Sequence, residues 1–395
     1  MTHAGPLQGI TVVSLEQAIA APFCTRQLAE LGARVIKVER PGQGDFARGY
    51  DQRVQGLASH FVWTNRSKES LTLDVKSQAG AKVLHALVDQ ADVLVQNLAP
   101  GAAERLGLGA EGLRAKDPRK VVCDISGYGA DGPYRERKAY DLLVQAESGF
   151  LSTTGTPETP SKAGCSIADI AAGMYAYSGI LAALLERERS GEGCHLDVSL
   201  LESMVEWMGF PLYYAFDGAP PPPRNGASHA AIYPYGPFSV GDGGTVMLGL
   251  QNEREWQQFC EVVLQRPALA EETRFKGNAA RVAERDALLA IITEVFADLT
   301  TAAVLQRLEQ AGIANARMND MHSVWNHEQL SARERWAQVD TEAGAIPALR
   351  PPGLPPELLS AMGPVPSVGE HSDAILSELG YSHTAIDQLR RDQVI

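Results

Sequence analysis

Apolar runs alternate with helical stretches between residues 9 and 126. The stretches 9–15 and 32–39 have the composition of buried strands, and the segment 22–31 between them has helical spacing. A helix that begins near residue 79 leads to a buried strand at 92–95, and another strand follows at 121–126. Strands that alternate with helices form βαβ units, so this pattern predicts a parallel sheet.

Polar or glycine-rich loops follow three of these strands, at 16–22, 96–97 and 127–134. Ligands bind at the carboxyl ends of parallel strands, so we expect a binding site at this edge of the sheet. The first loop, EQAIAAP, lacks the GxGxxG spacing of dinucleotide-binding folds. A dinucleotide site is therefore not supported.

The segment 161–202 organises the middle of the chain. Its apolar stripe recurs at steps of four and three residues, which predicts a helix against a core, at Ile170, Met174, Tyr177, Leu181 and Leu184. Glycines and alanines make the helix thin, so another backbone or a ligand can approach it closely. The helix stops at the glycines of 190–193, and a strand is expected at 194–200.

Asp169 lies in the first turn of this helix, and two interpretations are open. Ser166 and Asp169 fit the capping-box pattern, in which each side chain bonds a backbone amide of the other residue. Alternatively, the helix N-terminus holds Asp169 as an ionised carboxylate, the form that covalent catalysis at a carbonyl needs.

The second half of the chain is divided by proline-rich segments at 217–226 and 347–356. Between them the sequence predicts a hairpin over 236–250 that turns at the glycines of 241–244. Helical periodicity follows, at 253–264, 280–296 and 302–311, and the tail is mostly helical at 370–389.

Composition excludes several classes of protein. The 395 residues carry a net charge of −13, which argues against general nucleic-acid binding. Neither a membrane-length apolar run nor a signal peptide is recognisable, and the five cysteines have no CxxC spacing. We therefore expect a soluble cytoplasmic protein with reduced thiols and no metal site.

Several long motifs resemble the class III CoA-transferases, the family of formyl-CoA transferase, carnitine CoA-transferase and alpha-methylacyl-CoA racemase. They include GITVVSLEQAIAAPFCTRQLAELGARVIKVERPGQGDFAR, NRSKESLTLDVK, QNLAPGAAERLGLG, ISGYGADGPYRERKAYDLLVQAESG, DGGTVMLGLQNEREW and VGEHSDAILSELG. The resemblance implies an α/β fold: a doubly wound, Rossmann-like large domain with a smaller α+β domain inserted, in an interlocked homodimer. It suggests a large domain over 1–216, a linker at 217–228, a small domain over 229–330, and a linker and return to the large domain over 331–395.

The same resemblance implies the chemistry. Asp169 would be the nucleophile that forms an anhydride with a donor acyl-CoA and then a CoA thioester. Coenzyme A is then a substrate, with no permanently bound cofactor. Amides at the helix N-terminus around Asp169 are expected to stabilise the oxyanions that form. The motifs favour succinyl-CoA as donor and a short dicarboxylic acid such as itaconate, mesaconate, citramalate or malate as acceptor.

The resemblance also assigns residues to CoA. Cationic side chains near the nucleotide and its phosphates would be Arg40, Lys76, Arg105 and Lys138. Residues that line the cleft would be Ala18, Ile19, Leu73, Asn97 and Leu98. Taken singly, each cation also fits a solvated surface charge.

Tyr140 departs from the racemase branch, which has a histidine base at this position. Since a tyrosine is a poor base at neutral pH, the alternative of an acyl-CoA racemase or epimerase is disfavoured. The glycine-rich lid of formyl-CoA transferase has no counterpart in 236–250, which disfavours formyl and oxalyl transfer. Arg48, Arg224 and His229 remain candidates for substrate contact, alongside Tyr140 itself.

Overall fold

The structure, a computed structural model, describes residues 5–354 and 362–395. These residues form two compact units. The first unit contains the chain up to Phe150 together with Ala163–Phe210 and Leu330–Ile395, and the second contains Leu151–Lys162 and Pro211–Gln329. The segment 151–162 thus joins the second unit, whereas the sequence prediction kept it in the large domain. Residues 355 and 356 of the proline-rich break lie outside the described residues.

The first unit is built around a six-stranded parallel sheet, which confirms the predicted α/β fold with a large parallel sheet. Its order is β3-β2-β1-β4-β5-β6, and the chain order reverses between β1 and β4. The strands are β1 Thr11–Leu15, β2 Arg34–Glu39, β3 Glu69–Thr72, β4 Val93–Gln96, β5 Val121–Ser126 and β6 His195–Ser199. Strand β3 was not predicted, because the four residues ESLT contain no apolar run.

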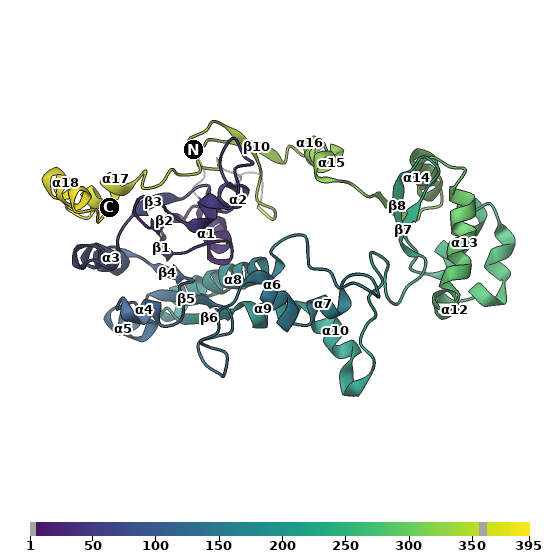
Figure 1. The fold of residues 1–395 in the computed structure, drawn as a ribbon, viewed down its shortest axis with the longest axis horizontal. Coiled ribbons are helices and arrows are strands. Elements are labelled where there is room, and N and C mark those ends of the chain that lie inside the picture. Colours follow the sequence, from purple (N-terminus) through teal and green to yellow (C-terminus); the bar gives the residue numbers. More distant parts are fainter. Residues whose placement is uncertain (1–4, 355–361) are drawn as a thin grey trace. The chain divides into compact units, whose positions relative to one another are not determined.

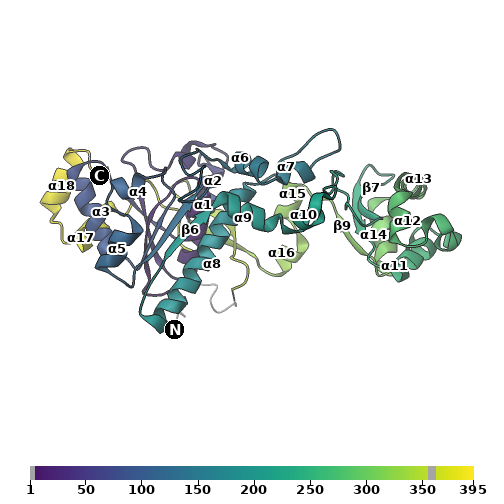
Figure 2. The ribbon, with the colours of Figure 1, turned by 90° about the horizontal axis from the view of Figure 1, so that it is seen from below.

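Helices cover both faces of this sheet (Figures 1 and 2). One face packs against α1 Ala20–Glu30, α8 Ile167–Ser190 and α9 Leu200–Trp207. The other packs against α3 Gln78–Gln90, α4 Ala102–Arg105, α5 Ala110–Lys116, α17 Ser372–Glu378 and α18 His383–Arg391. The C-terminal tail thereby returns to the sheet, where Ser372 Oγ accepts a hydrogen bond from the Thr72 amide at 3.1 Å.

Shorter elements complete the first unit. They are the 3₁₀ helix η1 Phe46–Gly49, α2 Ser59–Asn65, α6 Asp141–Glu147, α7 Phe150–Thr153, α16 Glu328–Ala332, β10 Trp336–Val339 and β11 Ile346–Leu349, of which α7 and α16 lie at the boundaries of the two units. Strands β10 and β11 pair antiparallel and share a small core with α2. The predicted proline-rich break therefore begins inside a strand.

The second unit is built around an antiparallel sheet of β7 Tyr235–Ser239, β8 Thr245–Gly249 and β9 Ala314–Arg317. This confirms the predicted hairpin and its turn. The helical elements are α10 Gly209–Tyr214, η2 Phe216–Gly218, α11 Glu253–Gln258, the π-helical turn η3 Phe259–Val263, η4 Pro267–Glu271, η5 Thr273–Phe275, α12 Asn278–Ala283, α13 Arg285–Phe296, α14 Thr301–Gln310 and α15 Met321–Trp325, of which α10 begins in the first unit. The helix predicted over 280–296 is thus two helices that meet at Glu284.

Helix α8 is the long helix that the apolar stripe predicted. By length and composition it passes the test for a membrane-crossing helix, and the bent pair formed by α13 and α14 passes it jointly. In the fold, however, α8 buries Ala172, Ala176 and Ile180 in the core shared with α1 and the sheet. It is a core helix of the first unit.

Gly173 lies where α8 packs tightly against α1. A Cβ atom at this position would lie 2.7 Å from the backbone oxygen of Ala20 and 3.1 Å from a ring carbon of Phe23. Ala20 begins α1, and Gly173 lies one turn after Asp169. The contact therefore fixes the start of α8 against the start of α1.

Replacing Gly173 with alanine should force these two helices apart. We expect Gly173→Ala to lower the free energy of unfolding by about 1–3 kcal/mol through overpacking. Gly179→Ala is the matched control, because its Cβ would meet Leu196 at an ordinary 3.4 Å and alanine favours the helix. Urea unfolding of both variants checks this, and equal stability of the two would contradict the account.

Candidate active site

The loops after β1 and β4 meet where the strand order of the sheet reverses. The Gln17 amide donates to Asn97 Oδ1 at 2.9 Å, and Asn97 Nδ2 donates back to the Gln17 carbonyl at 2.9 Å. The Leu98 amide is held in turn by Gln96 Oε1 at 2.7 Å. Two of the predicted cleft segments, 18–19 and 97–98, are therefore joined at the switch point of the sheet, where open α/β folds bind ligands.

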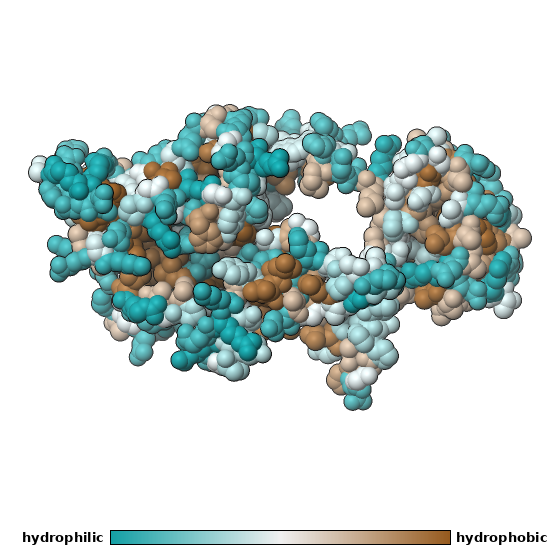
Figure 3. All heavy atoms as spheres, viewed as in Figure 1, coloured by the Kyte–Doolittle hydropathy of each residue, from teal (hydrophilic) through white to brown (hydrophobic). Residues whose placement is uncertain are grey.

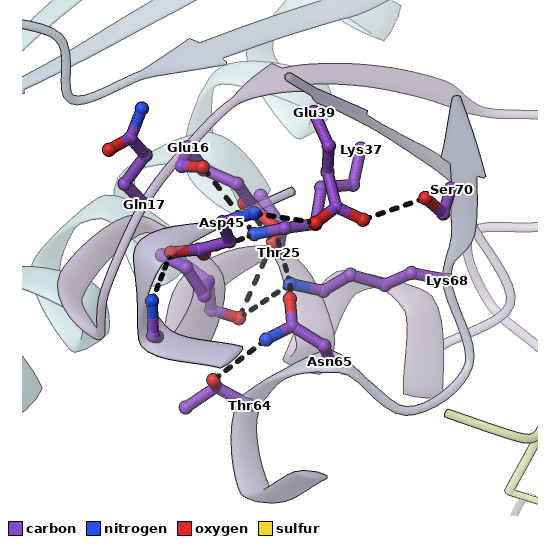
Figure 4. A network of polar contacts seen from close by, with 12 residues as sticks. Glu16, Gln17, Thr25, Lys37, Glu39, Asp45, Thr64, Asn65, Lys68 and Ser70 are labelled. Carbon is purple, nitrogen blue, oxygen red and sulfur yellow. Dashed lines mark hydrogen bonds and ion pairs between the residues drawn. The ribbon is translucent and has the colours of Figure 1, made fainter. Parts of the chain in front are cut away.

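A buried network of charged side chains contacts the loop after β1 and fixes its conformation (Figure 4). Glu16, the residue after β1, accepts hydrogen bonds from Lys68 Nζ at 2.6 Å and Lys37 Nζ at 3.3 Å. Lys37 also donates to Asp45 Oδ2 at 2.8 Å. The Asp45 carboxylate then accepts from the Ala18 amide at 3.2 Å. Ala18, a predicted cleft residue, is held in this way with a positive φ of 62°.

Arg48 belongs to the same network, which the sequence did not indicate. Its guanidinium donates to both oxygens of Glu39, at 2.7 and 2.9 Å, and to the Pro366 carbonyl at 3.1 Å. It also lies 3.7 Å from the centre of the Phe61 ring. The predicted substrate contact of Arg48 must therefore compete with these protein contacts.

The network remains charged despite its burial. Burial favours the neutral form of Glu39, but Arg48 and Lys37 outweigh it and lower the pKa of Glu39 to about 2. Burial lowers the pKa of Lys68 to about 8, against the opposing effect of Glu16. Glu16, Glu39 and Asp45 thus balance Lys37, Lys68 and Arg48 in charge.

Asp169 lies on the first turn of α8, but the predicted capping box does not form. Ser166 occupies the N-cap position with φ −76° and ψ 70°, and its side chain makes no capping bond. Instead Asp141, from α6, accepts from the Ala168 amide at 2.8 Å and the Asp169 amide at 3.4 Å. A carboxylate 27 residues upstream therefore takes the place that the local pattern assigned to the serine.

The electrostatics of Asp169 also differ from the prediction of a fully ionised carboxylate. Burial and the neighbouring Asp141 charge raise the pKa of Asp169 to about 7. The amides of Ala168 and Asp169 point at Asp141, so these two are not available as oxyanion donors. The presence of a second carboxylate at the helix terminus was not predicted, and it accounts for both differences.

The four predicted cationic residues follow the carboxyl ends of four different strands. Arg40 follows β2, Lys76 follows β3, Arg105 is in α4 after β4, and Lys138 is in the loop after β5. All four are exposed, and none forms a salt bridge with any residue that the structure describes. Leu73, by contrast, is buried between β3 and α3. Exposed cations along one edge suit either phosphate groups or solvent.

Two exposed tyrosines, Tyr50 and Tyr140, interact electrostatically with each other, and Tyr50 also interacts with Asp169. Tyr140, immediately before α6, is 69% exposed. Burial together with the charges of Asp45, Asp169 and Tyr140 raises the pKa of Tyr50, which places Tyr50 close to these groups. The sequence reasoning singled out neither Tyr50 nor Gln17 nor Asp141, because their roles depend on contacts distant in the chain.

Arg224 and His229 lie in the second unit and are held by contacts within it. Arg224 donates to the carbonyls of Thr156 and Pro157 at 2.9 and 2.7 Å. The His229 ring stacks on Tyr235 with centroids 5.2 Å apart. Among the described residues no group of three or more histidine, cysteine or acidic side chains is arranged to hold a metal ion.

A carboxyl group with a raised pKa beside a doubly wound sheet, with exposed cations along the strand ends, fits an enzyme that acts on an anionic ligand. Comparison with known proteins identifies the class. The model of CoA-transferase family III matches residues 7–372, and the chain belongs to this family. It is an enzyme of the CoA-transferase type.

Named relatives cover almost the whole chain. Human succinyl-CoA:glutarate CoA-transferase is 32% identical over 98% of this chain and 90% of its own length. The succinyl-CoA:mesaconate CoA-transferase of Haloarcula marismortui is 32% identical over 95% of this chain and 97% of its own. A CAIB/BAIF family protein from Brucella suis, solved by crystallography, has a TM-score of 0.84 at 33% identity and covers 95% of this chain and 100% of its own.

The buried network should be essential for stability. Lys37→Met would leave Glu16 and Asp45 buried with too little positive charge, and we expect a loss of about 3–5 kcal/mol in the free energy of unfolding. Lys76→Met, at an exposed position, is the control and should change stability by less than about 0.5 kcal/mol. Urea titrations that show equal effects for the two variants would contradict this role of the network.

Proposed function

We propose that the enzyme transfers CoA from succinyl-CoA to a short dicarboxylic acid of the glutarate, mesaconate, itaconate, citramalate or malate type. The observation that carries this proposal is the Asp169 carboxyl, held at the start of α8 with a pKa of about 7. A carboxylate is the nucleophile that this exchange needs. The names of the relatives support succinyl-CoA as donor and a dicarboxylate as acceptor.

The reaction proceeds in covalent steps. The Asp169 carboxylate attacks the thioester carbonyl of the donor, and CoA leaves as the thiolate, which gives a mixed anhydride. The thiolate then attacks the aspartyl carbonyl, releases the donor acid as a carboxylate and leaves CoA as a thioester on Asp169. The acceptor carboxylate repeats these steps in reverse and restores Asp169. A carboxylate of raised pKa is more basic, and hence more nucleophilic, than an ordinary one.

We assign the anionic part of CoA to the exposed cations along the strand ends, Arg40, Lys76, Arg105 and Lys138. Guanidinium and ammonium groups bind phosphate through charge-assisted hydrogen bonds. The pantetheine arm would pass the joined loops at Ala18, Ile19, Asn97 and Leu98, next to buried Leu73. This path follows the carboxyl edge of the sheet, where the strand order reverses.

The second carboxylate of the acceptor needs a cationic or amide donor. Arg48 is the weakest of the candidates, because Glu39 and the Pro366 carbonyl already occupy its donors. Arg224 is half-buried and donates to two neutral carbonyls, with no carboxylate partner among the described residues, and His229 is half-buried as well. Arg224 is therefore the candidate we favour for this contact, and His229 and Tyr140 are separate candidates.

We also propose that the enzyme is a homodimer with interlocked chains, working in the cytoplasm. Figure 3 shows apolar surface over α6, whose Leu142 and Leu143 are exposed. A run of large apolar side chains from α9 to η2 is exposed as well, at Trp207, Phe210, Leu212, Tyr213, Tyr214 and Phe216. Exposed large apolar side chains in this number suit a protein interface. The five cysteines are unpaired thiols, as expected in a reducing compartment.

The substrate assignment is tested by incubating the purified enzyme with succinyl-CoA and a panel of acids. We expect new CoA thioesters of one or two dicarboxylates, detected by mass spectrometry, and little transfer to oxalate or carnitine. Asp169→Ala should lower the rate on the order of 10³-fold or more. The wild-type rate should fall about tenfold per pH unit below pH 7, because only ionised Asp169 attacks.

Other outcomes would redirect the assignment. Solvent deuterium that enters an acyl-CoA without any transfer would favour a racemase. Transfer that survives in Asp169→Ala would remove this residue as nucleophile. Sedimentation velocity on the same preparation should show a dimer, and an active monomer would contradict the proposed assembly.

A further inference from the structure

Helix α6 carries two polar side chains one turn apart that hold the segment leading into α8. Asp141 Oδ1 accepts from the amides of Ala168 and Asp169, as described above. Gln145 Oε1 accepts from the Ala163 amide at 2.9 Å. Gln145 Nε2 donates to Asp141 Oδ2 at 2.6 Å, and Gln145 is fully buried. Helix α6 therefore clamps both ends of the segment 163–168.

This clamp reverses the usual electrostatics of a helix start. Free amides at a helix N-terminus favour a negative side chain in the first turn. Here one carboxylate already occupies those amides, and the next carboxylate, Asp169, lies beside it. Asp169 thus has a like charge as its neighbour in place of free hydrogen-bond donors.

The other charged groups on the helices packed against α8 are acidic, apart from Arg26 on α1; they include Glu147 on α6 and Glu206 on α9, both exposed. On α1, Arg26 and Glu30 lie 3.7 Å apart as an ion pair. On α9, Glu202 accepts from Ser199 Oγ at 2.6 Å. These side chains are therefore engaged locally and do not serve as counter-ions for Asp169.

Among the described residues, the adjoining strands β5 and β6 add no counter-ion either. The ionisable residues of β5 and β6, which are Asp124, His195 and Asp197, lie on the face opposite α8, because their neighbours Cys123 and Leu196 pack on the α8 side. Tyr50, which interacts with Asp169, has a raised pKa and is therefore an uncharged phenol at neutral pH. Asp141 is thus the charged group of the described neighbours that acts most directly on Asp169.

We propose that Asp141 is a positioning residue for the reaction: its carboxylate fixes the first turn of α8 and destabilises the free carboxylate of Asp169 relative to its acylated forms. This inference rests on the proposed function, in which Asp169 is the nucleophile. When Asp169 attacks a thioester, its negative charge leaves with the CoA thiolate. In both the anhydride and the aspartyl thioester, Asp169 is neutral. The repulsion from Asp141 is therefore present in the resting enzyme and relieved in each covalent intermediate, which favours acylation.

The test moves the charge while keeping the hydrogen bonds. In the double variant Asp141→Asn/Gln145→Glu, the side-chain amide introduced at position 141 still accepts, through its oxygen, from the amides of 168 and 169. Its NH₂ group donates to the new carboxylate at position 145, which still accepts from the Ala163 amide. The negative charge thus moves one helical turn along α6, away from the start of α8. The single variant Asp141→Ala, which removes the clamp, serves as the comparison.

The readout is the titration of Asp169 itself, followed by isotope-edited infrared difference spectra against Asp169→Asn, with the pH dependence of transfer measured in parallel. We expect the wild-type carboxyl to titrate near pH 7 and the double variant about one to two units lower. The acid limb of the rate profile should shift by the same amount. The melting temperature of the double variant should stay near that of the wild type, whereas Asp141→Ala should melt lower through loss of the cap.

The infrared titration tests the role of Asp141 independently of the proposed function. A shifted titration in an enzyme that transfers no CoA would support the role of Asp141 while overturning the function. An Asp169 titration that is the same in the double variant and the wild type would overturn the inference, whatever the activity. A wild-type Asp169 that titrates near pH 4 would overturn it as well.

Discussion

The free-energy cost of burying charged side chains determines how the strands of the first unit are arranged. Six charged side chains in and around β1, β2 and β3 lie largely out of contact with water, and each must meet an opposite charge. Glu16 can do so only if Lys37 and Lys68 both reach it. That requirement fixes β1, β2 and β3 relative to one another. Through Asp45 it also fixes the Ala18 amide, and so the conformation of the loop on which we place the CoA cleft.

The burial of charge has a different outcome at Asp169. The network at β1 satisfies every buried charge, whereas the first turn of α8 places two carboxylates side by side. The structure tolerates this because Asp141 is bonded to backbone amides and Gln145, while Asp169 can take up a proton near neutral pH. Repulsion between like charges is found at reacting groups, because the reaction removes one of the charges. A rigid scaffold and one destabilised carboxyl group are together what covalent acyl transfer requires.

Sequence reasoning recovered the parts of this protein that depend on local pattern. Apolar runs predicted the parallel sheet, the long helix α8 and the β7–β8 hairpin, and family motifs pointed to Asp169. It failed where a distant residue replaces a local one. Ser166 fits a cap by spacing, but Asp141 fills that place through the tertiary contact of α6 with α8. Arg48 was a candidate for substrate contact, yet its guanidinium is bonded to Glu39 and lies over the ring of Phe61. Neither partner can be inferred from spacing along the chain.

The central claim is that Asp169 carries CoA during turnover. It is tested most directly by mixing the enzyme with succinyl-CoA alone, quenching with borohydride, and mapping the protein by peptide mass spectrometry. A thioester is reduced to an alcohol, so the account predicts that the peptide containing Asp169 loses one oxygen and gains two hydrogens, as aspartate becomes homoserine. No change at Asp169, or reduction at another carboxylate in its place, would contradict the account.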